Sequence, residues 1–318
     1  MKGGRVNAQT SAGSEANSSG LSDSRSLQPD STPAQSFDAE AYKVAKRQEW
    51  NDVAPSVGRW WRIVYEAPLV PVTNRMIELA EIEPGHHVLD VATGLGEPAL
   101  SIAAVVGPAG QVTATDISAE MLRIARARAS EAGLTNLDFV EQDAEAIDYP
   151  DDSFDAALCR FSLMFLSDPV SAITRMRRAL KNGGRFVATV WGPPERVPFI
   201  SVTMGVIARE LQLAPPPPGT PGVFALADRR ALEELLRKAG FGEVKSEPLN
   251  VSFEFASTDE YIRYVQDVAL PIWGLMANES AERKDQVWRA VADAHRPFEG
   301  PDGVMRMDGE SILVSGRR

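Results

Sequence analysis

The chain has 318 residues, of which 44% are hydrophobic and 24% are charged. This length and composition predict a globular protein with a sizeable core, organised as one large domain or two small ones. The formal net charge of −11 argues against a nucleic acid or an anionic membrane as the main partner. It is compatible with solubility and with a small neutral or cationic ligand.

Cysteine and hydropathy patterns narrow the class of protein further. Cys159 is the single cysteine, so a disulfide framework or a multi-cysteine zinc site within one chain is excluded, and we expect no metal. A reducing cytoplasm is the simplest location for such a chain. No apolar run approaches the roughly 20 residues that a membrane helix needs, and no apolar stretch follows Lys2 and Arg5 to form a secretory signal.

The N-terminal part of the chain divides at about residue 37. Residues 1–37 are rich in small and polar residues and predict a disordered tail, because they cannot bury enough surface to offset their ordering entropy. The remaining residues 38–318 are predicted to form one domain. Its first segment, 38–80, looks helical and carries a dense aromatic cluster that either packs on the core or forms a lid over a substrate. The cluster comprises Tyr42, Trp50, Trp60, Trp61 and Tyr65.

Residues 81–192 show regular alternation of apolar strands and helices. The expected strands are 87–92, 112–115, 137–140, 154–159 and 185–190, and the expected helices are 98–106, 119–132 and 169–180. Ser118 is placed to cap the second helix. This alternation predicts a doubly wound parallel sheet covered on both faces, whose ligands lie beyond the carboxyl ends of the strands.

Residues 193–318 are less regular and are predicted to form a substrate cap and the last strands. Helices are expected at 229–239, 261–268 and 283–294, and strands at 244–255 and 311–315. Asp228 is placed to cap the first of these helices.

The first strand leads into the segment Asp90-Val91-Ala92-Thr93-Gly94-Leu95-Gly96-Glu97. Its two glycines allow a sharp turn and a close approach of a ligand to the main chain. The turn also resembles the dinucleotide fingerprint, so a nicotinamide enzyme must be considered. However, Asp90 and Glu97 would repel a pyrophosphate, whereas they tolerate the ammonium and sulfonium cations of S-adenosylmethionine (SAM).

Two further acidic positions follow the next strands. Asp116 ends the second strand about 20 residues beyond the glycine turn, where a carboxylate can accept hydrogen bonds from ribose hydroxyls; this suits SAM and NAD equally. After the third strand, Glu141-Gln142-Asp143-Ala144-Glu145 offers a carboxylate for an adenine amino group and the Ala144 N–H for a ring nitrogen. Taken alone, residues 141–145 are better interpreted as a solvated acidic loop.

Taken together, these segments resemble the class I SAM-dependent methyltransferases, and among them the branch of the ubiquinone/menaquinone C-methyltransferases. The resemblance covers roughly residues 80–192 and includes Thr115-Asp116-Ile117-Ser118 with Met121, Gln142-Asp143-Ala144-Glu145, and Ser153-Phe154-Asp155-Ala156 with Phe161. It implies a seven-stranded, Rossmann-like α/β fold with helical N-terminal and C-terminal cap elements. It implies SAM as the cofactor and methyl transfer as the reaction. The aromatic and apolar residues expected around the pocket favour a small, hydrophobic or aromatic acceptor, methylated on carbon or oxygen.

The resemblance also implies cofactor-binding roles by position. Asp90 and the glycine loop would surround the methionine part, Asp116 the ribose, Asp143 the adenine edge, and Phe161 would lie near the methyl group. The full predicted set is Asp90, Ala92, Thr93, Gly94, Gly96, Asp116, Ile117, Met121, Asp143, Ala144 and Phe161. The fourth strand ends in Arg160-Phe161-Ser162-Leu163 instead of Asn/Asp-Pro-Pro-Tyr, which argues against methylation of nucleic-acid amines.

No residue stands out as the catalytic base. Tyr65, Arg160 and His295 are candidates for contact with the acceptor, while His86 and His87 lie at the end of the first strand that is far from the site. Two alternatives stay open beside the methyltransferase: a nicotinamide oxidoreductase, and a protein that binds SAM without turnover. A homodimer is compatible with all three.

Overall fold

A computed structural model describes residues 37–269 and 274–318 of the chain. Residues Ala39–Arg318 form one compact unit, and the residues that precede it belong to a separate unit. The predicted disordered tail, residues 1–37, lies outside the described residues except for Phe37, so the proposed domain boundary stays a prediction. We describe the unit Ala39–Arg318.

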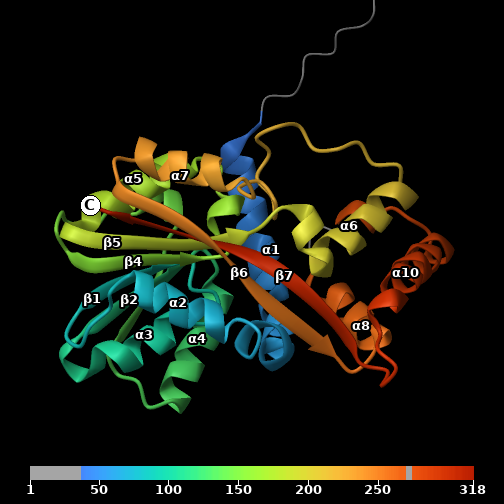
Figure 1. Ribbon diagram of the computed structural model, residues 1–318, viewed down its shortest axis with the longest axis horizontal. Coiled ribbons are helices and arrows are strands. Elements are labelled where there is room, and N and C mark those ends of the chain that lie inside the picture. Colours follow the sequence, from blue (N-terminus) through green and yellow to red (C-terminus); the bar gives the residue numbers. More distant parts are fainter. Residues whose placement is uncertain (1–36, 270–273) are drawn as a thin grey trace, which may run out of the picture. The chain divides into compact units, whose positions relative to one another are not determined.

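A seven-stranded sheet forms the centre of this unit (Figure 1). Its strands are β1 His87–Val91, β2 Gln111–Asp116, β3 Leu137–Glu141, β4 Phe154–Arg160, β5 Leu180–Trp191, β6 Gly242–Phe255 and β7 Met305–Arg317. Their order is β3-β2-β1-β4-β5-β7-β6, and β7 runs antiparallel to both of its neighbours. The expected doubly wound α/β sheet is thereby confirmed.

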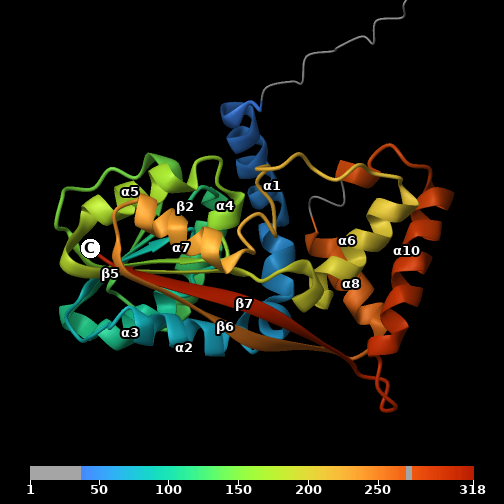
Figure 2. The ribbon, with the colours of Figure 1, turned by 45° about the horizontal axis from the view of Figure 1, so that its top comes forward.

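Helices cover the two faces of the parallel part of the sheet. In both ribbon views α2 and α3 lie on one side and α5 and α7 on the other (Figures 1 and 2). The helices are α2 Val70–Leu79, α3 Ala99–Val106, α4 Ala119–Glu131, α5 Pro169–Ala179 and α7 Arg229–Lys238. Because both faces are covered there, the inner strands are largely apolar, and Val88, Leu89 and Val91 of β1 are completely buried.

Side-chain caps fix where several of these helices begin. Ser118 has an extended backbone and its hydroxyl accepts the N–H of Met121, which starts α4 as predicted. Asp228 accepts the N–H groups of Arg230 and Ala231 at the start of α7, also as predicted. Short helical turns occupy the connections: the 3-10 helices Gly107–Ala109, Ala144–Ala146, Leu163–Phe165, Pro194–Arg196 and Arg296–Phe298.

The N-terminal segment is helical, as expected, and lies over α4. It consists of α1 Ala39–Arg59 and a π-helical turn, Trp61–Glu66, before α2. A second hydrophobic cluster, separate from the main core, joins it to the glycine loop and to α4 through Val53, Ala54, Val57, Trp61, Leu95 and Met121. The segment is therefore packed onto the part of the fold where a ligand is expected.

The C-terminal strands extend farther than predicted. Within β7, only Ser311–Arg317 pairs with β5. Met305–Glu310 continues past the rest of the sheet as a two-stranded ribbon with β6. Side chains alternate between buried and exposed along this pair of strands. Its buried face packs on a group of helices that lie together at its far end (Figure 2). These helices are α6 Pro198–Glu210, α8 Thr258–Val268 and α10 Ala281–His295. None of the described helices is long and apolar enough to span a bilayer.

Candidate active site

The turn between β1 and α3 has the backbone geometry of a ligand-binding loop. Gly94 (φ +57°) and Gly96 (φ +101°) both occupy conformations that favour glycine. The Gly94 N–H donates to Oδ2 of Asp116 at 2.8 Å, and the Thr93 N–H donates to the carbonyl of Thr115 at 2.8 Å. Ala92 also has a positive φ of 58°, which the sequence pattern did not indicate. The loop is thus fastened to the end of β2.

Asp90 is a completely buried carboxylate directly below this loop. Its Oδ2 accepts the N–H of Ala99 at the start of α3 at 3.1 Å, whereas its Oδ1 has no hydrogen-bond partner. Burial raises the pKa of Asp90 to about 7, and the nearby Glu97 carboxylate acts in the same direction. A cationic ligand group would stabilise the ionised form of this carboxyl group.

Asp116 is the second buried acid of the site. Its Oδ1 accepts the N–H of Ser118 at 2.9 Å while Oδ2 holds Gly94. Burial raises the pKa of Asp116 to about 6, although these backbone N–H donors oppose the shift. Asp116 therefore sets the shape of the loop in addition to the ribose-binding role expected of it.

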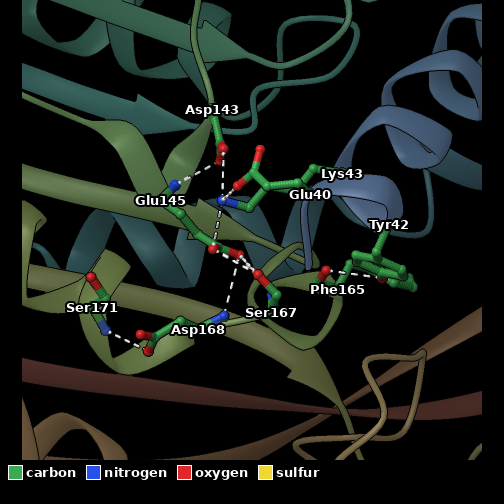
Figure 3. A network of polar contacts seen from close by, with 9 residues as sticks. All are labelled: Glu40, Tyr42, Lys43, Asp143, Glu145, Phe165, Ser167, Asp168 and Ser171. Carbon is green, nitrogen blue, oxygen red and sulfur yellow. Dashed lines mark hydrogen bonds and ion pairs between the residues drawn. The ribbon is translucent and has the colours of Figure 1, made fainter. Parts of the chain in front are cut away.

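A network of polar contacts ties α1 to the loop after β3 (Figure 3). The Lys43 ammonium lies 3.1 Å from Oδ2 of Asp143 and 2.9 Å from Oε2 of Glu145. Glu145 in turn accepts the N–H and hydroxyl of Ser167. Burial alone would raise the pKa of Glu145, but Lys43 and Ser167 together hold it below its usual value. Lys43 thus forms an ion pair with Asp143, the carboxylate that we predicted to contact adenine. The sequence did not indicate this pairing.

Further contacts hold α1 over the same region. Asn51 accepts the hydroxyl of Ser118 at 2.7 Å and the N–H of Glu120 at 3.2 Å through its Oδ1, so α1 is joined to the first turn of α4. Trp50 packs edge-to-face on Phe165, with ring centroids 5.8 Å apart. The aromatic residues of the N-terminal segment therefore pack on the fold, and Trp50 also lines a pocket. That they form a lid over a substrate stays a prediction.

A pocket of about 60 Å³ remains between α1 and the strand ends. Four predicted cofactor residues line it together: Ala92, Ile117, Asp143 and Ala144. Pockets for cofactor-sized ligands usually exceed roughly 300 Å³. The site is therefore narrow with α1 in this position, and α1 is the element that would have to shift for a larger ligand to enter.

Buried polar atoms without a partner gather at this edge of the sheet, which is where a polar ligand fits. Four of the eight such atoms in the described part of the chain lie here: Asp90 Oδ1, Thr93 Oγ1, Gln142 Oε1 and Thr189 Oγ1. Such atoms are uncommon in folded proteins because each costs desolvation energy. An added β-carbon on Gly94 would meet no protein atom within 4 Å, so the loop leaves space open. The residues present therefore fit a polar, partly cationic nucleoside such as SAM.

Aromatic rings border the ends of β4 and β5. Phe161 (φ +53°) stacks on Trp191 with ring centroids 4.3 Å apart, and Trp191 is 9% exposed. Beside them, Arg160 donates to the Thr73 hydroxyl of α2 at 2.9 Å. Tyr65 stacks on Trp61, and burial raises the pKa of Tyr65, which keeps its hydroxyl protonated at neutral pH.

The structure places the remaining candidate, His295, inside the C-terminal cap. It is completely buried, with Nδ1 2.7 Å from the Val291 carbonyl and Nε2 3.3 Å from the Thr203 hydroxyl. Tyr261 packs against the imidazole at 4.5 Å between ring centroids. Burial lowers the pKa of His295. Its contacts are those of a cap residue, and no catalytic role for Tyr65, Arg160 or His295 goes beyond a prediction.

The sheet order, the glycine loop and the acids at the strand ends define a class I methyltransferase fold. Residues 88–184 match the family model of the methyltransferase domain, which confirms the resemblance derived from the motifs. The ubiquinone/menaquinone biosynthesis C-methyltransferase UbiE of Pseudoalteromonas translucida is 39% identical over 123 residues, which are 38% of this chain and 49% of that protein. The chain thus spans about half the length of the curated relatives it matches.

Solved structures agree on the fold. Phosphoethanolamine N-methyltransferase 2 of Haemonchus contortus, in complex with S-adenosyl-L-methionine, superposes with a TM-score of 0.55 at 17% identity, covering 90% of this chain and 61% of that one. The 4+2 cyclase SpnF superposes with a TM-score of 0.53 at 23% identity, covering 85% and 94%. At these identities the likeness concerns the fold alone.

Proposed function

We propose that this protein transfers a methyl group from SAM to a small, hydrophobic or aromatic acceptor. One observation carries the proposal: two acids, Asp90 and Glu97, flank a glycine loop at the start of α3. A pyrophosphate at a helix N-terminus would be repelled by both carboxylates. A nucleoside that carries an ammonium and a sulfonium is attracted by them.

The residues around the loop suit the parts of such a cofactor. Asp90 would lie near the amino-acid end, Asp116 would accept the ribose hydroxyls, and Asp143 with the Ala144 N–H would bind adenine. SAM, when bound, supplies an electrophilic methyl group on a sulfonium. The chain would orient the acceptor and exclude water. Phe161 and Trp191 would form an apolar wall for both purposes, against which a flat acceptor can lie.

Binding tests separate the proposal from the nicotinamide alternative. Isothermal titration of the purified chain with SAM, S-adenosylhomocysteine, NAD and NADP should show affinity for the first two and none for the others. Binding of NAD or NADP in place of SAM would overturn the proposal.

Turnover needs a separate test because the cyclase SpnF shares this fold, so the fold does not decide the reaction. Incubation with methyl-labelled SAM and a panel of quinols, phenols and amines should transfer label to at least one phenol or quinol. Binding of SAM without transfer to any acceptor would favour the non-catalytic alternative.

Replacing Lys43 by methionine should ease entry of the nucleoside. The change removes the ion pairs from α1 to Asp143 and Glu145, and a partly exposed ion pair contributes about 1 kcal/mol at most. The two pairs together give an upper limit of about 2 kcal/mol, so we expect S-adenosylhomocysteine to associate up to about 30-fold faster. Stopped-flow tryptophan fluorescence measures this rate, since Trp50 lines the pocket.

Lys46 provides the matched control for this experiment. It lies on the same helix, but its ion pair joins Glu49 within α1, at 2.5 Å. Lys46→Met removes the same charge without releasing α1, so its association rate should stay close to that of the unaltered protein. Equal acceleration in both variants would show that net charge, and not the contact to Asp143 and Glu145, controls entry.

The partner and the location belong to the proposal as well. The net charge of −11 supports a small-molecule acceptor over a nucleic acid. The single, completely buried Cys159 is compatible with a reducing cytoplasm. A homodimer is also proposed, and size-exclusion chromatography with light scattering tests it.

A further inference from the structure

Arg160 is the last residue of β4, at the edge of the sheet that carries the ligand loop. β4 pairs with β1 so that Cys159 lies beside Val91, which brings Arg160 next to Ala92 of the ligand loop. On its other side Arg160 pairs with Thr189 of β5, whose buried hydroxyl lacks a partner. A long cationic side chain therefore starts at the point where the cofactor loop and the acceptor wall meet.

The guanidinium has few partners for its five N–H donors. Thr73 accepts one hydrogen bond at 2.9 Å, and no ion pair joins Arg160 to any carboxylate in the described residues. Burial lowers the pKa of Arg160, although Glu97 and Asp90 lie close enough to act in the opposite direction. Arg160 is half-buried, and the donors that Thr73 does not use can bind an anion at this edge of the sheet.

The surroundings of Arg160 carry both signs of charge. Asp90 has a buried oxygen without a partner, and Glu97 lies just before α3 at the same end of the sheet. Acids and a cation placed this way complement a ligand that holds an ammonium and a carboxylate on neighbouring atoms. The planar guanidinium fork matches a carboxylate through two parallel hydrogen bonds.

We propose that Arg160 binds the carboxylate of the cofactor's amino-acid end, with Thr73 as the positioning residue that orients the guanidinium. The inference rests on the proposed function and adds to it a specificity determinant: Arg160 makes the site select a nucleoside that carries an amino acid over one that lacks it. Asp90 and Glu97 then receive the ammonium of the same group.

Two ligands that differ only in this group provide the test. S-Adenosylhomocysteine carries the amino acid, whereas 5′-methylthioadenosine keeps adenine, ribose and sulfur without it. In isothermal titration, Arg160→Met should weaken binding of S-adenosylhomocysteine about 10- to 100-fold, as expected for a lost charge-assisted hydrogen-bond pair. Affinity for methylthioadenosine should change less than about threefold, which also shows that the variant is folded.

Two further variants refine the test. Arg160→Lys keeps the charge but not the fork, so it should recover part of the lost affinity. Thr73→Val keeps the guanidinium of Arg160 but removes the hydrogen bond that orients it. It should weaken binding of S-adenosylhomocysteine only a few fold and leave binding of methylthioadenosine unchanged.

The outcomes separate the two proposals. If the unaltered protein binds neither ligand, the proposed function fails. If it binds both, and Arg160→Met weakens both equally or leaves both unchanged, the function stands and the role of Arg160 is wrong.

Discussion

Replacing Gly94 by alanine should remove most of the affinity for S-adenosylhomocysteine while the protein stays folded. The site of the added methyl group is free of protein atoms within 4 Å, so no clash within the chain is expected. The same free space is where a ligand would approach the main chain. A methyl group there would push the ligand away from the loop.

Backbone strain is the side effect that this experiment has to separate. Gly94 has φ +57°, and an alanine in the left-handed region costs about 1–2 kcal/mol of stability. Gly133, at the end of α4, has φ +69° and also has no atom within 4 Å of an added β-carbon. Gly133→Ala should therefore lose similar stability in urea unfolding and keep its affinity in isothermal titration. Equal affinity in the two variants would mean that the ligand does not approach Gly94.

The parts of this site that sequence predicts are those that local patterns encode. The run Val88–Val91, the glycines after it and the cap at Ser118 lie within a few residues of one another, and each has a steric or hydrogen-bonding reason for its place. The ends of the parallel strands then bring Asp90, Asp116 and Asp143 to one edge without further information.

The parts that sequence does not predict depend on contacts across long separations. Lys43 and Asp143 are 100 positions apart, and neither has a local pattern that indicates the other. The start of β7 depends on a distant partner in the same way: Met305–Glu310 forms its ladder with β6 and not with β5, and its polar outer residues look like a loop until the ribbon is formed. Tertiary packing decides both features.

The affinity for S-adenosylhomocysteine should rise with pH and level off above about 7. Burial raises the pKa of Asp90 to about 7, so Asp90 is mostly protonated at pH 5.5 in the free protein. The ligand ammonium favours the ionised carboxylate, and binding below pH 7 must therefore release a proton. Asp116, whose pKa is raised to about 6, adds a second rise at lower pH if it accepts the ribose hydroxyls as charged acceptors.

Asp90→Asn isolates the contribution of Asp90. The amide oxygen can still accept the Ala99 N–H, so the start of α3 is kept. The variant should bind more weakly at pH 8 and lose the rise near pH 7, retaining only the one near 6. Isothermal titration in buffers of different ionisation enthalpy measures both affinity and proton release. A profile near pH 7 that is the same in both proteins would exclude Asp90 as the titrating group.

The stability of the ligand-free protein provides an independent check. Ionisation of Asp90 favours ligand binding but disfavours folding, so Asp90→Asn should affect affinity and stability with opposite pH dependence. The pKa of Asp90 is higher in the folded than in the unfolded chain, so the folded state holds the extra proton between about pH 4 and 7. Each pH unit in that window costs the unaltered protein up to about 1.4 kcal/mol from this group, a cost that asparagine does not bear. The free energy of unfolding of Asp90→Asn, relative to the unaltered protein, should therefore increase as pH rises from 4 to 7. The same buried carboxyl group that destabilises the ligand-free fold at neutral pH is the one whose charge attracts the ligand.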